Sequence, residues 1–109
     1  MTHLDVEYES GSAGAEAAAV AKFSDDRWEL NVRAPASEFL TLRDIRTFAW
    51  DRRNVARVGS CAGASVFWCS DGQTATIMVG QDDESWDVAV LVPVEVVDDL
   101  VRQMERRSL

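Results

Sequence analysis

Two periods of hydrophobicity follow one another along the chain. From Trp28 to Ala34 apolar side chains alternate with polar ones, which predicts a half-buried strand that ends at Pro35. Residues 36–46 then carry apolar side chains at every third position, a spacing that predicts a short amphipathic helix. These positions are Phe39, Leu42 and Ile45. A strand therefore leads directly into a helix here.

The same succession returns near the C-terminus. Residues 86–92 alternate again, Pro93 ends the alternation, and residues 94–107 carry one apolar stripe at helical spacing. The stripe consists of Val97, Leu100, Val101 and Met104. Between the two units, apolar or β-branched runs at 55–61, 65–70 and 74–79 are separated by the turn-forming stretches AGA and DGQ. These runs predict a meander of strands.

The N-terminal segment leaves one assignment open. Residues 4–10 fit a strand. Residues 15–23 are rich in alanine, whose propensity favours a helix, whereas a hairpin with the strand at Trp28 requires a strand. The whole pattern predicts a single α+β domain over residues 1–109, with two helices and an antiparallel sheet of about six to seven strands.

Two parts of the chain match without gaps, which suggests an internal repeat. Residues 25–42 superpose on residues 83–100, so that Trp28 falls on Trp86 and Pro35 on Pro93. The shared unit is an acidic turn, a strand that begins with tryptophan, a proline and a helix. A duplication explains this match, and so does the general similarity of strands that end in proline before an amphipathic helix. Both explanations stay open.

The strand-to-helix junctions also support a family resemblance. The stretches "VRAPASEFLTLRDI" and "VLVPVEVVDDLVRQM" are similar to those of domains of the bacterial DNA polymerase III beta sliding clamp. In that family such domains assemble into a ring whose helices line the hole and face DNA. The resemblance extends from Trp28 to the C-terminus, and it implies a clamp-like fold in which N-terminal strands replace those expected after the second helix. It transfers no functional residue by position.

Charge and composition narrow the class of protein. The net charge of −8 argues against a free-standing nucleic-acid binder, and it serves either solubility alone or recognition of a basic partner. The longest apolar run falls short of the roughly 20 residues of a membrane span, and the first ten residues do not resemble a signal peptide, so we expect a cytoplasmic protein. Ten of the eleven basic residues are arginine, which is typical of a GC-rich bacterial genome.

One short stretch has the spacing of a catalytic motif. Gly59, Cys61 and Gly63 stand as in a nucleophile elbow with cysteine in place of serine. An elbow requires a helix after the nucleophile, whereas "SVFWCS" predicts a strand, and the only histidine, His3, lies in a terminal segment. We therefore expect the glycines to form a turn or a bulge, and we expect no catalytic residue.

The two cysteines and the acidic stretches predict neither a disulfide nor a bound ion. With AGA as a hairpin loop, Cys61 faces Ser65 and Cys69 faces Arg57, which places the sulfur atoms too far apart to bond. Two cysteines and one histidine without close spacing do not make a zinc site. The stretch "DDESWD" lacks the ligand spacing and the glycine of a calcium loop. We expect free thiols, no metal and no cofactor.

The tryptophans and the acidic turns are the candidates for partner binding. Trp28 and Trp86 lie on the apolar faces of their strands, so we expect them in the core. Trp50 lies between helix and strand in "TFAWDRR", where it is either part of the core or an exposed anchor of an interface. The candidate partner-binding residues are Asp25, Asp26, Trp50, Asp82, Asp83 and Glu84.

Three classes of function follow from these features. The leading hypothesis is a non-catalytic protein that binds a macromolecular partner, as immunity proteins, antitoxins, inhibitors and accessory factors do. The second is a clamp-like, self-associating protein near DNA, and the third is a small thiol enzyme. The second hypothesis requires a basic face on the two helices, formed by Arg43, Arg46, Arg102 and Arg106. Nearby carboxylates such as Asp99 offer these arginines local partners instead.

Overall fold

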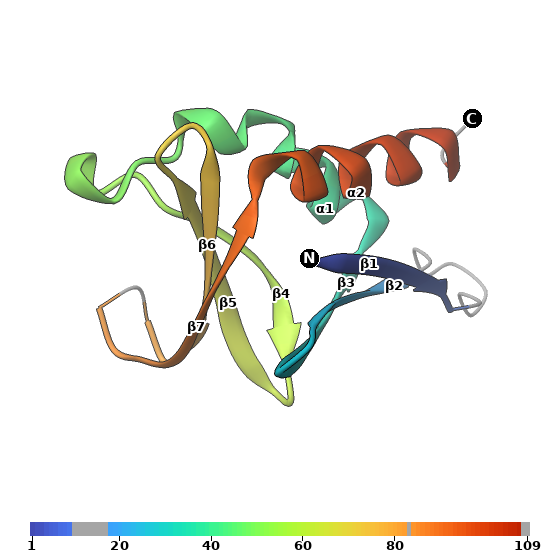
Figure 1. Cartoon of the computed structure of the whole chain (residues 1–109), viewed down its shortest axis with the longest axis horizontal. Coiled ribbons are helices and arrows are strands. Elements are labelled where there is room, and N and C mark those ends of the chain that lie inside the picture. Colours follow the sequence, from blue (N-terminus) through green and yellow to red (C-terminus); the bar gives the residue numbers. More distant parts are fainter. Residues whose placement is uncertain (10–17, 83, 108–109) are drawn as a thin grey trace.

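Seven antiparallel strands form one sheet in chain order, and helices cover one of its faces (Figure 1). The computed structural model describes residues 1–9, 18–82 and 84–107. The strands are β1 (His3–Tyr8), β2 (Ala18–Asp25), β3 (Trp28–Pro35), β4 (Ala56–Cys61), β5 (Ala64–Ser70), β6 (Thr74–Gly80) and β7 (Trp86–Pro93). The helices are α1 (Ala36–Leu40) and α2 (Val94–Arg107), with 3-10 segments η1 (Thr41–Thr47) and η2 (Trp50–Arg52). The predicted α+β class is confirmed.

The alanine-rich segment is a strand in its described part, so the helix that propensity favoured is wrong there. Residues 15–17 lie outside the described residues, and β2 begins at Ala18 between β1 and β3. Ala19, Ala21 and Phe23 alternate with more exposed residues and are completely buried. Pairing on both sides and burial of every second side chain outweigh the high helix propensity of alanine, which amounts to less than about 1 kcal/mol per residue.

The helical layer buries the apolar stripes that the sequence indicated. All seven side chains of the two stripes are buried, and α2 contacts α1, η1 and both edge strands, β1 and β7. The helix expected over residues 36–46 is divided, because α1 ends at Leu40 and continues as a 3-10 segment in which Asp44 departs from helical geometry. At three residues per turn, η1 keeps the side chains of Leu42 and Ile45 on one face.

The glycines of the cysteine stretch form a bulge and a tight turn, as predicted. Gly59 has φ +80° at an irregularity in the pairing of β4 with β5, and Gly63 has φ +86° in the hairpin turn. A strand follows the turn, which excludes the geometry of a nucleophile elbow. The expected register is wrong by one residue at the turn, which consists of Ala62 and Gly63 and places Cys61 opposite Ala64. It is wrong by two residues beyond the bulge, where Arg57 faces Phe67 and not Cys69. Both thiols are free.

The two matching segments have the same local structure and different surroundings. β3 and β7 are each eight residues long, and each ends on the proline that precedes a helix. Trp28 is half-buried and packs against the core, but Trp86 is 43% exposed, so the expectation that Trp86 lies in the core is wrong. The pairing of β7 with β6 shifts register between Val79 and Gly80, so Trp86 lies opposite Gly80 and does not continue the face of Val88, Val90 and Val92 that the sequence indicated. Descent of the two units from a duplication stays a prediction.

Among the described residues, Trp68 on β5 has the largest fully buried side chain. Its side chain is completely buried, and its Nε1 donates a hydrogen bond of 3.0 Å to the carbonyl of Val58. The ring meets Phe23 edge to face, with 5.8 Å between the centroids. Within the described part of the chain, no helix has both the length and the apolar character to cross a membrane.

Candidate functional site

Two adjoining hollows lie beside η2, where the helical layer meets the end of β5. Their volumes are about 690 and 340 Å³, and both are lined by Trp50, Ser70 and Asp71. The larger hollow follows η1 and η2 and includes Asp51, whereas the smaller one crosses the sheet to Leu91 on β7. We call these five residues the η2 surface. It combines exposed apolar side chains with carboxylates.

Backbone and side-chain hydrogen bonds attach the segment that carries Trp50 to the sheet. The amide of Ser70 donates to the carbonyl of Phe48 over 2.7 Å, and the hydroxyl of Ser70 donates to the carbonyl of Ile45 over 2.8 Å. Asn54 donates from its side-chain amide to the carbonyl of Thr47 over 3.0 Å. These bonds fix the path of the chain on both sides of η2, so Trp50 is presented by an ordered segment.

Trp50 itself is exposed, and the reading that placed it in the core is wrong. Its side chain is 39% exposed, and the guanidinium of Arg53 lies 5.6 Å from the centroid of its ring. Arg53 adopts the left-handed conformation that ends η2, with φ 57°. The cation–π contact restrains the indole without covering it.

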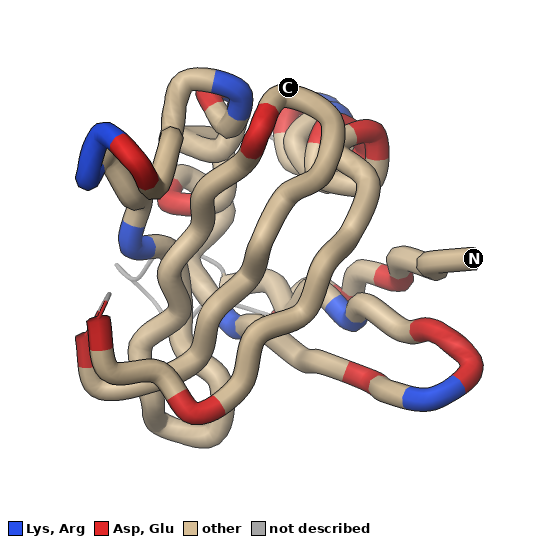
Figure 2. The backbone as a smooth tube through the Cα atoms, turned by 60° about the vertical axis from the view of Figure 1, so that its left-hand side comes forward, with Lys and Arg blue, Asp and Glu red and all other residues tan. Residues whose placement is uncertain are grey.

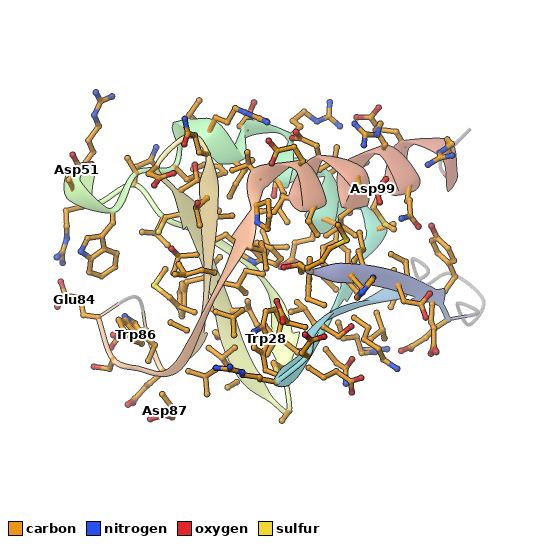
Figure 3. The ribbon with its side chains drawn as sticks, viewed as in Figure 1. Trp28, Asp51, Glu84, Trp86, Asp87 and Asp99 are labelled. Atoms are coloured by element: carbon orange, nitrogen blue, oxygen red, sulfur yellow. The ribbon has the colours of Figure 1, made fainter. Side chains whose placement is uncertain are left out.

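An ion pair connects η2 to the loop between β6 and β7. Arg53 pairs with Glu84, so a carboxylate of that loop lies next to the segment of Trp50. In the same loop Asp82 accepts a hydrogen bond from the amide of Glu84 over 2.8 Å, which shapes the turn. Asp83 lies outside the described residues. Figure 3 shows Asp51, Glu84, Trp86 and Asp87 along the same side of the molecule.

Charges of both signs line the larger hollow, since the guanidinium groups of Arg46 and Arg52 lie there with the carboxylates of Asp51 and Asp71. Asp71 accepts hydrogen bonds from the amides of Gln73 and Thr74 at 2.9 and 2.7 Å, and these bonds hold the pKa of Asp71 below its ordinary value. The nearby Arg46 forms two hydrogen bonds of 2.7 Å with Asp98 of α2, which lower the pKa of Asp98 and neutralise this arginine. Because its pKa is lowered by the backbone hydrogen bonds, Asp71 is ionised at neutral pH.

The acidic residues that the sequence indicated do not form one patch. Asp25 and Asp26 lie at the turn between β2 and β3, and β4 and β5 separate this hairpin from the β6–β7 hairpin in the sheet. Asp25 accepts a hydrogen bond of 2.6 Å from the amide of Asp26 and lies 3.9 Å from the N-terminal amine. In Figure 2 the acidic positions, in red, are spread over several separate segments. Among the described candidate residues, Glu84 lies next to the segment of Trp50, and Asp82 lies in the same loop as Glu84.

The arginines of the candidate basic face are exposed, but several have local partners. Arg46 pairs with Asp98, and Arg102 lies 3.6 Å from Asp99, the carboxylate expected to compete for it. Arg43 donates from Nε to the carbonyl of Leu40 over 3.0 Å. Arg106 is exposed near the end of α2. A phosphate approaching this face has to compete with carboxylates already in place.

Sequence reasoning missed Val88 and Leu91, the most exposed apolar side chains of β7. They are 47% and 65% exposed, and they point to opposite faces of the sheet. The available signal was that residues 88–92 are apolar at every position, which is unusual for a strand with one solvated face. Exposure on both faces makes β7 an apolar edge.

The thiols have no catalytic surroundings in the described residues. Cys69 is buried on β5, and this burial raises the pKa of its thiol. His3 lies on β1, and β2 and β3 separate it from the strand of Cys61. Among the described His, Cys, Asp and Glu residues, no group of three is arranged to hold a metal ion.

Comparison with known proteins finds no matching family model, no similar curated protein and no similar solved structure.

Proposed function

We propose that this protein is a non-catalytic binding module that recognises another protein through the η2 surface. The observation that carries the proposal is Trp50, an exposed indole on a hydrogen-bonded segment between two hollows. Tryptophan is enriched among the residues that dominate interface energies, and an anchor that is already ordered loses little entropy on binding.

The carboxylates around Trp50 favour a basic partner. Asp51 and Asp71 line the larger hollow, and Glu84 pairs with Arg53 beside it. Arg46 and Arg52 line the same hollow, but Arg46 is already paired with Asp98, and the whole chain carries a net charge of −8. A complementary positive surface accelerates association with such a site and excludes acidic competitors. The partner that fits places an apolar side chain against the indole, with Lys or Arg around it. Immunity proteins, antitoxins, inhibitors and accessory factors act through such surfaces.

The experiment is affinity capture from a lysate of the source organism, followed by titration of the purified partner. Replacing Trp50 with Ala should weaken binding by about tenfold or more, as expected for an interface anchor. The double variant Asp51→Asn, Glu84→Gln should also weaken it. Its matched control is Asp25→Asn, Asp26→Asn, which removes the same charge from a distant turn and should have little effect. A partner that binds Trp50→Ala as tightly as the wild type would contradict the proposal.

A second candidate function is that of a clamp-like, self-associating protein near DNA. It is favoured by the arrangement of the two strand–proline–helix units, because α1 and α2 pack side by side on the same face of the sheet. Arg43, Arg46, Arg102 and Arg106 are exposed on this helical layer. A monomer without affinity for DNA at about 50 mM salt would eliminate this function, since phosphate contacts are strongest at low salt. Loss of DNA binding in Arg102→Ala, Arg106→Ala would support it.

A further inference from the structure

The smaller hollow lies on the face of the sheet opposite α2. A row of side chains crosses three neighbouring strands there, because Cys69 is paired with Thr76 and Thr76 with Leu91, and all three line the hollow. The adjacent residues Trp68 and Ile77 point to the other face, where they belong to the core that α2 covers. The smaller hollow is therefore built on hydrogen-bonded strands and is separate from the core.

Two exposed apolar side chains border the smaller hollow. Trp50 lines it from η2 at 39% exposure, and Leu91 lines it from the edge strand β7 at 65% exposure. Its volume of about 340 Å³ is at the lower end of the range of about 300 to 1,000 Å³ that is typical of small-ligand pockets. The hollow therefore has room for one long side chain of a partner, but not for a helix or a strand.

Among the described residues that line the smaller hollow, Asp71 is the only charged one. Its Oδ1 accepts both backbone hydrogen bonds, from the amides of Gln73 and Thr74, and these bonds hold the carboxylate in place and lower its pKa. Its Oδ2 accepts no hydrogen bond from the part of the chain that the structure describes. A fixed, ionised carboxylate with a free oxygen beside apolar side chains favours a cationic group on a long apolar stem.

The arginines nearby leave this carboxylate available. Arg46 and Arg52 line the larger hollow, to which Asp71 also belongs. Two hydrogen bonds hold Arg46 to Asp98 of α2, and no ion pair joins Arg52 to Asp71 among the described residues. Arg52 is therefore a neighbouring cation that weakens the attraction of Asp71 for a ligand without neutralising it.

We propose that the smaller hollow binds one arginine side chain of the partner protein, with the guanidinium against Asp71 and the stem along Leu91 and Trp50. This inference rests on the proposed function, which places Lys or Arg of the partner around Trp50, and it specifies where one of them binds. Arginine fits better than lysine, because its guanidinium is planar, more weakly hydrated and able to stack on an aromatic ring. Thr74, whose amide bonds to Asp71, also offers a hydroxyl as an acceptor for the remaining N–H groups.

The test uses a blocked peptide, acetyl-glycyl-arginyl-glycine amide, and so requires no identified partner. It is titrated into the ¹⁵N-labelled full chain and followed by NMR, where the indole N–H of Trp50 and the amides of Thr76 and Leu91 should shift. We expect a dissociation constant on the order of 1 mM at about 50 mM salt, and weaker binding at higher salt. The same peptide with citrulline, which keeps the shape of arginine without its charge, should bind about tenfold more weakly or less.

Asp71→Asn is the decisive variant, because it removes the charge and keeps Oδ1 as an acceptor for the two backbone amides. It should weaken binding of the arginine peptide by about tenfold or more. Asp25→Asn is the matched control, since Asp25 also accepts a backbone hydrogen bond but lies at the turn between β2 and β3, and it should have little effect. Arg52→Ala removes the neighbouring cation and should strengthen binding. Circular dichroism verifies that each variant is folded.

Three outcomes would overturn the proposal. These are no shift around the smaller hollow at about 10 mM peptide, equal binding of the citrulline peptide, and an unchanged affinity in Asp71→Asn.

Failure of this inference is distinguishable from failure of the proposed function. A partner that depends on Trp50 but binds Asp71→Asn as tightly as the wild type would support the η2 surface and refute the arginine site. Peptide binding that depends on Asp71, together with a partner indifferent to Trp50→Ala, would support the arginine site and contradict the proposed function.

Discussion

Replacement of Gly59 with Ala tests how closely β4 approaches β3 at the bulge. Gly59 has φ +80°, a conformation that costs a residue with a side chain about 1 kcal/mol. An added Cβ would lie 2.7 Å from Cγ1 of Val32 and 2.9 Å from the carbonyl oxygen of Arg33. The oxygen belongs to the backbone of β3 and cannot turn away, and the amide of Gly59 is held by Glu38 over 2.7 Å. Overpacking of this kind costs a further 1 to 3 kcal/mol, approximately.

The expected total is a loss of about 3 kcal/mol in the free energy of unfolding. Gly63→Ala is the matched control, because Gly63 has φ +86° but no atom within 4 Å of an added Cβ, so only the backbone strain of about 1 kcal/mol remains. Urea denaturation followed by tryptophan fluorescence measures both variants. If Gly59→Ala destabilises the protein no more than Gly63→Ala does, the close approach of β3 to this bulge is not what requires glycine there.

Three further predictions concern the core, the thiols and the response to pH. Trp68→Ala should cost about 3 to 5 kcal/mol in a denaturant titration, whereas Trp86→Ala at the exposed edge should cost about 1 kcal/mol; similar losses would contradict the burial of the two rings. Alkylation followed by mass spectrometry should modify Cys61 before Cys69, because burial raises the pKa of the Cys69 thiol and leaves less thiolate; the reverse order would refute this. The guanidinium of Arg46 lowers the pKa of the Asp98 carboxyl. The stabilisation that this ion pair gives to the fold is therefore complete above the ordinary carboxyl pKa of about 4, and it is lost as the pH falls through the lowered value. The difference in urea midpoint between wild type and Asp98→Asn should therefore shrink on acidification below about pH 4, and a constant difference would argue against the ion pair.

Part of the candidate site could be predicted from the sequence. Trp50 stood out as an aromatic residue beside arginines, and Glu84 as part of an acidic turn. Their proximity could not be predicted, because it depends on an ion pair between Arg53, which lies before β4, and Glu84, which lies three strands later in the loop after β6. Leu91 was assigned to an ordinary half-buried strand and was missed.

For β3 and α2 the sequence by itself determined the element and the face that it buries. Side-chain direction repeats every two residues in a strand and about every 3.6 in a helix, so the alternation in β3 and the stripe of α2 follow from short-range geometry. The same holds for the turn at Gly63, where a positive φ favours a residue without a side chain.

Only the tertiary structure decided which strands have neighbours on both sides. Trp28 and Trp86 have closely similar local sequences, yet one is half-buried and the other exposed. β3 has β2 and β4 as neighbours, whereas β7 is an edge whose pairing with β6 shifts register at Trp86. The alanine-rich segment became β2 for the same reason, since β1 and β3 supply its hydrogen bonds. Strand pairing joins residues that are distant along the chain, and its energy depends on which neighbours are present, so a local pattern determines the face of a strand but not its place in the sheet.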